Sequence, residues 1–184
     1  MMDGRLFCLA AGFVLVATAV GATRPSALFT DHAVLRRSAA TPVFGLADPG
    51  ERVRVSLGTA RAEATAGADG KWLVRLNLAD IRGDALELRM NDCVARDVAV
   101  GEVWLCSGQS NMEFTMGSAD DAEEENRVTN RWLRCFVVNG GTSASPQREV
   151  RGRWLVTEPG STMRMTAGGY HFAKELQGRL KTPF

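Results

Sequence analysis

The sequence has almost no excess of charge of either sign. Its 22 lysines and arginines stand against 21 aspartates and glutamates, which gives a formal net charge of +1. It also lacks a stripe of lysine and arginine with interleaved aromatic residues. These two absences argue against binding to nucleic acid or to an anionic membrane surface. Histidine and cysteine are scarce, and their spacings suit no zinc site. We therefore expect no metal and no cofactor.

Long hydrophobic runs are absent too, with one exception at the N-terminus. Residues 6–20 are nearly all apolar, and Val20-Gly21-Ala22 offers the small residues that a signal peptidase accepts. A membrane anchor is the alternative, but the run is shorter than the roughly 20 residues that a spanning helix needs. The pattern predicts a signal peptide over residues 1–22, cut near Ala22, and a secreted or periplasmic protein with no other membrane segment.

Few cysteines remain once the predicted signal peptide, which contains Cys8, is removed. Cys93, Cys106 and Cys135 are an odd number for an exported protein. Cys106 is most simply a small buried hydrophobic residue. Cys93 and Cys135 are far apart in the sequence, and the sequence leaves open whether they pair.

One stretch of the chain is strongly acidic. Five carboxylates occur close together; they are Asp120, Asp121, Glu123, Glu124 and Glu125. Such a run is typical of a solvated face. A calcium site is the alternative, because hard cations take carboxylate oxygens, but the spacing fits no known loop motif.

Residues 23–98 alternate between apolar and polar side chains in short runs, which is typical of β-strands. The clearest runs are residues 52–57 and 71–76, and turns such as Asp48-Pro49-Gly50-Glu51 separate the runs. Several short strands at close spacing predict a β-sandwich domain over residues 23–98. Because this domain is small, we expect it to pack against the part of the chain that follows and to be stabilised by it.

After residue 98 the pattern changes. Residues 103–106 and 133–138 are apolar runs that predict two buried strands, and residues 152–156 predict a short extended segment. Trp104, in the first of these, is expected in the core, and a platform for a sugar ring is the alternative. Residues 166–180 carry apolar side chains at helical spacing, which predicts an amphipathic helix. The alternation of strand and helix predicts the beginning of a wound α/β sheet in residues 99–184, so the fold class is mixed β and α/β.

Residues 101–114 read GEVWLCSGQSNMEF. This block resembles the nucleophile turn of SGNH-type ester hydrolases, in the Gly-Gln-Ser-Asn form of sialate O-acetylesterases and related carbohydrate esterases. Further stretches resemble the same family in the family's own order; they are residues 27–37, 42–53, 69–72 and 169–176. The resemblance therefore spans essentially the whole chain after the predicted signal peptide.

The resemblance implies an exported serine esterase that removes O-acetyl groups from sialic acid or other acetylated carbohydrates. Ser110 is then the nucleophile, and its backbone N–H is one oxyanion donor. Gly108, Gln109 and Asn111 support the turn, although the amides of Gln109 and Asn111 could instead bond the substrate. The implied fold is a β-sandwich followed by an incomplete SGNH-type (flavodoxin-like) α/β/α domain over residues 99–184.

A serine nucleophile needs a base within hydrogen-bond reach. Members of the family carry an Asp-x-x-His block near the C-terminus, beyond the helix that residues 169–176 resemble, and no such block lies in this sequence. His32 and His171 are the only histidines, and neither matches the base of the family. We therefore expect an N-terminal portion of an esterase that is inactive by itself. The alternative is a non-catalytic module, derived from such an esterase, that binds a glycan or a protein.

Overall fold

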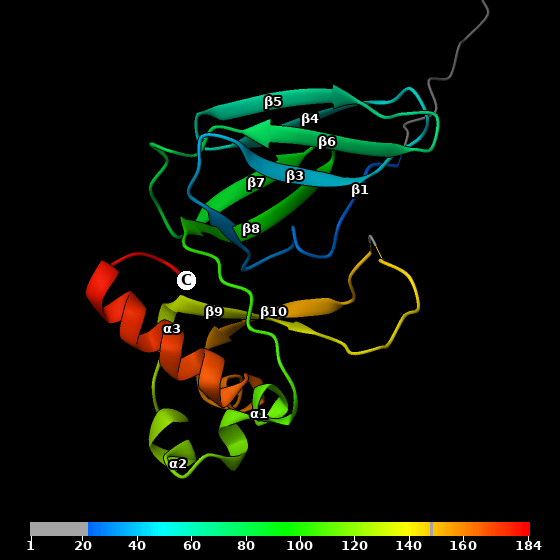
Figure 1. The fold of residues 1–184 in the computed structure, drawn as a ribbon. Coiled ribbons are helices and arrows are strands. Elements are labelled where there is room, and N and C mark those ends of the chain that lie inside the picture. The colour runs from blue at the N-terminus through cyan, green and yellow to red at the C-terminus, as the bar shows by residue number, and fades with distance from the viewer. Residues whose placement is uncertain (1–21, 148) are drawn as a thin grey trace, which may run out of the picture.

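The structure is a computed structural model that describes residues 22–147 and 149–184. The predicted signal peptide, apart from Ala22, lies outside the described residues. The first half of the described chain forms two β-sheets, and the second half lies against them as a β-hairpin, several short helical turns and one long helix (Figure 1). Among the described residues, no helix is both long and apolar enough to cross a membrane.

Short strands make up the first half, as the alternating pattern predicts. They are β1 (Arg24–Pro25), β2 (Val34–Arg36), β3 (Thr41–Leu46), β4 (Arg52–Leu57), β5 (Ala60–Thr65), β6 (Lys71–Leu76), β7 (Leu86–Met90) and β8 (Cys93–Gly101). One sheet has the order β1-β3-β6 and the other β2-β8-β7-β4-β5. Neighbours pair antiparallel except β2 and β8, which run parallel. The strands predicted at residues 52–57 and 71–76 are confirmed as β4 and β6.

The side-chain alternation of these strands builds a common core. In β4, Val53, Val55 and Leu57 are buried, whereas the alternating Arg52 and Arg54 are exposed. Trp72 and Leu76 of β6 belong to the same buried cluster, so residues of both sheets share one core. Each fully buried aliphatic side chain of this kind contributes about 1.5–3 kcal/mol relative to exposure.

A β-hairpin and helices make up the second half. The elements are α1 (Ser110–Glu113), η1 (Met116–Ser118), α2 (Ala122–Glu125), β9 (Asn130–Val138), β10 (Gly152–Thr157), η2 (Thr162–Arg164) and α3 (Ala167–Leu180). β9 and β10 pair antiparallel, and a second buried cluster joins them to α3, with Leu133, Leu155 and Tyr170 among its members. The strand predicted at residues 133–138, the extended segment at 152–156 and the helix at 166–180 are confirmed.

The buried strand predicted at residues 103–106 is wrong. Residues 102–108 form no regular element, and the side chains of Val103, Trp104 and Leu105 are 46%, 57% and 91% exposed. Trp104 is therefore not a core residue. A strand buried on both faces needs neighbours on both sides, and the pattern of one segment cannot supply them. The wound α/β sheet expected over residues 99–184 also does not form among the described residues, where β9 and β10 are an antiparallel pair.

One buried arginine joins the two halves of the chain. The side chain of Arg134, in β9, is 0% exposed. Its Nε donates to the Arg131 carbonyl at 2.7 Å, and one terminal nitrogen donates to the Asp84 carbonyl at 2.9 Å and to Asp97 Oδ1 at 3.2 Å. Burial opposes ionisation of Asp97, but hydrogen bonding to His32 and the charge of Arg134 outweigh it and hold the pKa of Asp97 below its usual value. Asp97 thus anchors the hairpin to β8.

Candidate active site

Ser110 lies on the surface at the first position of α1. The Phe114 N–H donates to the Ser110 carbonyl at 3.0 Å and closes this single helical turn. The Ser110 N–H has no preceding helical carbonyl to bond, as is general for the first turn of a helix. An exposed hydroxyl beside such an N–H is what a serine nucleophile with an oxyanion donor needs.

Gly108, Gln109 and Asn111 surround Ser110 in the chain, and all three are exposed. The Gln109 carbonyl accepts the Met112 N–H at 2.8 Å. A Cβ on Gly108 would stand 3.0 Å from the Met112 Cγ, so a larger residue there would press on α1. These contacts are consistent with support of the turn, which stays a prediction for all three residues.

The N-terminal end of α3 holds α1 in place (Figure 1). The Ala167 N–H donates to the Phe114 carbonyl at 2.9 Å, and Thr115 forms an isolated antiparallel bridge with Thr166. The Thr166 hydroxyl also lies 3.8 Å from the sulfur of the half-buried Met112. These contacts begin two residues after Ser110, so α3 fixes the direction in which the Ser110 turn faces.

The next turn of α3 contacts the exposed segment that leads to Ser110. Phe172 stacks edge to face on Trp104, with 5.4 Å between the ring centroids. Gly169, one turn earlier, lies against Cys106. Sequence reasoning missed this contribution of α3, because the helical spacing shows that the helix has a packing face but not which segment packs there.

Each of the two histidines pairs with an aspartate, and among the described residues neither forms a hydrogen bond with Ser110. His32 Nδ1 lies 2.7 Å from Asp97 Oδ2 at the junction of the two halves. His171 Nε2 lies 3.4 Å from Asp121 Oδ2. Two residues of helix rotate the chain by about 200°, so His171 lies on a different face of α3 from Gly169, which contacts the Ser110 segment. The described residues therefore bring neither histidine to the serine.

One carboxylate of the acidic cluster is not solvated. Glu125 is 5% exposed; it accepts a hydrogen bond from the Tyr170 hydroxyl at 2.6 Å and pairs with Lys174. Burial opposes its ionisation, but the bonds from Lys174 and Tyr170 outweigh burial and hold the pKa of Glu125 below its usual value. Burial and Glu125 together raise the pKa of Tyr170. The triad of Glu125, Tyr170 and Lys174 ties α2 to α3, and the solvated-face interpretation is wrong for Glu125. Among the described residues, no three His, Cys, Asp or Glu side chains gather closely enough to hold a metal ion.

Cys106 does not follow the sequence-based interpretation either, and the open question of a Cys93–Cys135 pair is answered. Cys93, Cys106 and Cys135 are all free thiols. Cys106 is exposed rather than buried, because the segment that carries it is uncovered. Cys135, in β9, is half-buried; burial and the neighbouring Cys106 raise its pKa to about 11, so its thiol stays protonated at neutral pH.

Comparison with solved structures shows a likeness over most of the chain. The chain is similar to the crystal structure of a carbohydrate acetylesterase from Xanthomonas citri, with 35% sequence identity and a TM-score of 0.81. The likeness covers 88% of this chain but 39% of the other, so this chain spans about two fifths of the length of that esterase. No protein-family model and no curated protein sequence matches the chain.

Proposed function

We propose that this chain carries the nucleophile-bearing part of a serine esterase that removes O-acetyl groups from carbohydrates, with Ser110 as the nucleophile. The observation that carries the proposal is the place of Ser110. It is an exposed serine at the start of α1, on a turn that α3 fixes, in a chain whose fold is similar to that of a carbohydrate acetylesterase. The sialate-type nucleophile block at residues 101–114 extends the proposal to acetylated sialic acid or related sugars.

The chemistry follows from a positioned hydroxyl and an N–H donor. The Ser110 oxygen attacks the acetyl carbonyl carbon while the hydroxyl proton passes to a base. The Ser110 N–H stabilises the oxyanion that forms, and removal of one such donor typically costs about 2.7–4 kcal/mol of transition-state stabilisation. The bond from the acetyl carbon to the sugar oxygen then breaks, the sugar oxygen takes the proton, and water hydrolyses the acetyl-serine to release acetate.

The base is the part of this mechanism that the described residues do not supply. His32 and His171 are both paired with aspartates elsewhere in the fold. We therefore propose that the base comes from residues outside this sequence, as in the family that residues 101–114 resemble. Residues 1–184 alone should then show at most trace turnover.

Acetate release from an aryl acetate tests the proposal in two preparations: this chain alone, and the longer protein if the reading frame continues. In the longer protein, Ser110→Ala should abolish release, because it removes the attacking oxygen. Ser107→Ala is the matched control, since Ser107 is an exposed serine of the same segment with no part in the mechanism. Equal turnover by the Ser110→Ala protein and the parent would overturn the assignment. Robust, serine-dependent release by residues 1–184 alone would show that one of the two histidines serves as the base.

A further inference from the structure

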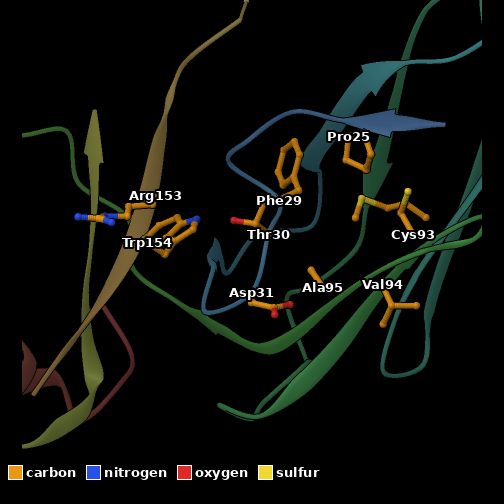
Figure 2. A pocket seen from close by; sticks show the side chains of 10 residues that line it. Pro25, Phe29, Thr30, Asp31, Cys93, Val94, Ala95, Arg153 and Trp154 are labelled. Carbon is orange, nitrogen blue, oxygen red and sulfur yellow. The ribbon is translucent and has the colours of Figure 1, made fainter. Parts of the chain in front are cut away.

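A cleft of about 420 Å³ opens between the two halves of the chain, where β10 faces the loop after β1 and the beginning of β8 (Figure 2). The loop with Phe29, Thr30 and Asp31 and the beginning of β8 form one side, and Trp154 of β10 forms the other. None of its lining residues belongs to the segment that carries Ser110. The cleft is therefore separate from the candidate active site.

Two aromatic rings give the cleft rigid walls. The Trp154 indole N–H donates to the Leu28 carbonyl at 3.0 Å, and its ring stacks edge to face on Phe136 with 5.5 Å between centroids. Phe29 is held in the same way by Phe44, with 5.1 Å between centroids. Because contacts within the protein already fix both rings, a ligand between them would not have to order them, which lowers the entropic cost of binding.

Hydrogen-bonding groups lie at the rim beside these rings. The carboxylate of Asp31 is fixed by the Arg96 N–H, which donates to Oδ1 at 2.7 Å, and an ionised carboxylate can accept several further bonds. Thr30 is also exposed, and Figure 2 shows its side chain directed toward Trp154. The hydroxyl donates to the Ala27 carbonyl at 3.2 Å, which leaves its oxygen free to accept. The rim thus offers acceptors at fixed positions.

We propose that this cleft binds one unit of a neutral saccharide. A sugar ring presents apolar C–H groups, which suit the half-buried ring of Trp154 and the small accessible part of Phe29, a residue 6% exposed. Its hydroxyl donors suit the acceptors of Asp31 and Thr30. The volume falls in the range of small-molecule sites, about 300–1,000 Å³, and domain interfaces are a common place for them. Arg153 also lines the cleft, but Figure 2 shows its side chain directed away from Trp154, whereas Asp31 lies at the rim beside the ring. The charge of Asp31 repels a sugar carboxylate, so an acidic sugar should bind worse than a neutral one. The proposal rests on the proposed function only for the class of ligand, a carbohydrate.

Tryptophan fluorescence distinguishes this cleft from the candidate active site, because each has a tryptophan of its own. The probes are the neutral oligosaccharides cellotetraose, xylotetraose and mannotetraose, with N-acetylneuraminic acid as the acidic counterpart. We expect a saturable change in fluorescence with at least one neutral probe. The change should disappear in Trp154→Phe and persist in Trp104→Phe, since Trp104 lies beside the Ser110 segment.

Asp31→Asn provides a second variant that keeps the fold, because its amide oxygen can still accept the Arg96 N–H. Asp31→Asn should lower the affinity for the neutral probe at least fivefold. Asp48→Asn, at another exposed aspartate, should leave this affinity unchanged. Thermal unfolding of each variant checks that its fold is intact.

Two results would overturn the proposal that the cleft binds a saccharide. One is a change that vanishes in Trp104→Phe but persists in Trp154→Phe, which would place the sugar beside Ser110. The other is no saturable change with any neutral probe up to about 20 mM, a concentration that would nearly saturate a site with a Kd of about 1 mM. The two proposals can fail separately. If the fluorescence change is lost in Trp154→Phe but acetate release is unchanged in Ser110→Ala, the result supports saccharide binding in the cleft and overturns the esterase proposal.

Discussion

Gly169 touches Cys106: a Cβ built on this glycine would stand 3.1 Å from the Cys106 sulfur and 2.6 Å from the Thr166 methyl carbon. A side chain at this position would therefore require the Thr166 methyl group to move and the Cys106 segment to yield by a few tenths of an ångström. The neighbouring Gly168 has open space around its own hypothetical Cβ. Two consecutive glycines of one helix thus have opposite structural requirements.

Gly169→Ala should destabilise the protein by about 1–3 kcal/mol, the usual cost of overpacking a filled contact. Gly168→Ala is the control, and we expect it to stabilise the helix by up to about 1 kcal/mol, because alanine is the better helix former. Chemical denaturation of both variants measures the difference. Equal effects of the two substitutions would contradict the close packing of Gly169 against Thr166 and Cys106.

Glu125→Gln should lower the free energy of unfolding at neutral pH by about 1–3 kcal/mol, because it weakens the bonds to Tyr170 and Lys174. The pKa of Glu125 is lowered in the folded state, so its stabilisation is complete above its ordinary pKa of 4.5 and is lost as the pH falls through the folded value. The gap between variant and parent should therefore close in acid. Unfolding curves at several pH values test this, with Glu124→Gln, at an exposed neighbour, as control. A gap that does not change with pH would show that Glu125 acts without its charge.

Arg134→Met should cost about 3 kcal/mol or more, because it leaves the carbonyls of Asp84 and Asp97 and part of the Asp97 carboxylate without their buried donor. Arg131 bonds the same carboxylate at 3.2 Å, but its side chain is 56% exposed. Arg131→Met should therefore cost less than about 1 kcal/mol. Thermal unfolding of the two variants makes the comparison, and a small loss for Arg134→Met would mean that other contacts join the two halves.

Leu105→Asn should reduce the binding of a hydrophobic dye without a measurable loss of stability. The Leu105 side chain is 91% exposed, so it contributes to an apolar surface but to no core. Surface substitutions of this kind usually change stability by less than about 0.5 kcal/mol. Leu133→Asn, at a residue 2% exposed in the second core cluster, should instead unfold the protein. Dye fluorescence and thermal unfolding, measured on the same samples, separate the two effects.

The elements that sequence predicts correctly are those whose pattern lies within one segment. β4 alternates buried and exposed residues along its own length, and α3 repeats its apolar residues at helical spacing. Residues 103–106 are as apolar as a core strand, yet their burial depends on neighbours from elsewhere in the fold. The apolar pattern of these residues favours burial, but it does not identify the segments that would pack against them.

In the candidate site, too, sequence predicts the residues of one contiguous motif but not those that act through distant contacts. The motif alone points to Ser110 as the candidate nucleophile, because the residues that surround it are contiguous in the chain. Glu125 looks like any other member of an acidic run, and what singles it out is contact with Tyr170 and Lys174, far along the chain. The only hint in the sequence is the separation of those two residues by four positions, which places them on one face of a helix.

The docking of Phe184 has a consequence for the order in which the protein folds during synthesis. Its N–H donates to the Trp132 carbonyl at 2.7 Å, its carbonyl accepts the Arg134 N–H at 2.9 Å, and its ring belongs to the second core cluster. Both sheets of the first half are complete once β8 has left the ribosome, so they can fold first. The second cluster is complete only after residue 184 has been made, and the docking of Phe184 on β9 closes a long loop, which slows this step. In that interval the nascent chain exposes apolar groups from β9 and α3, and we expect this to be the stage at which a chaperone binds it.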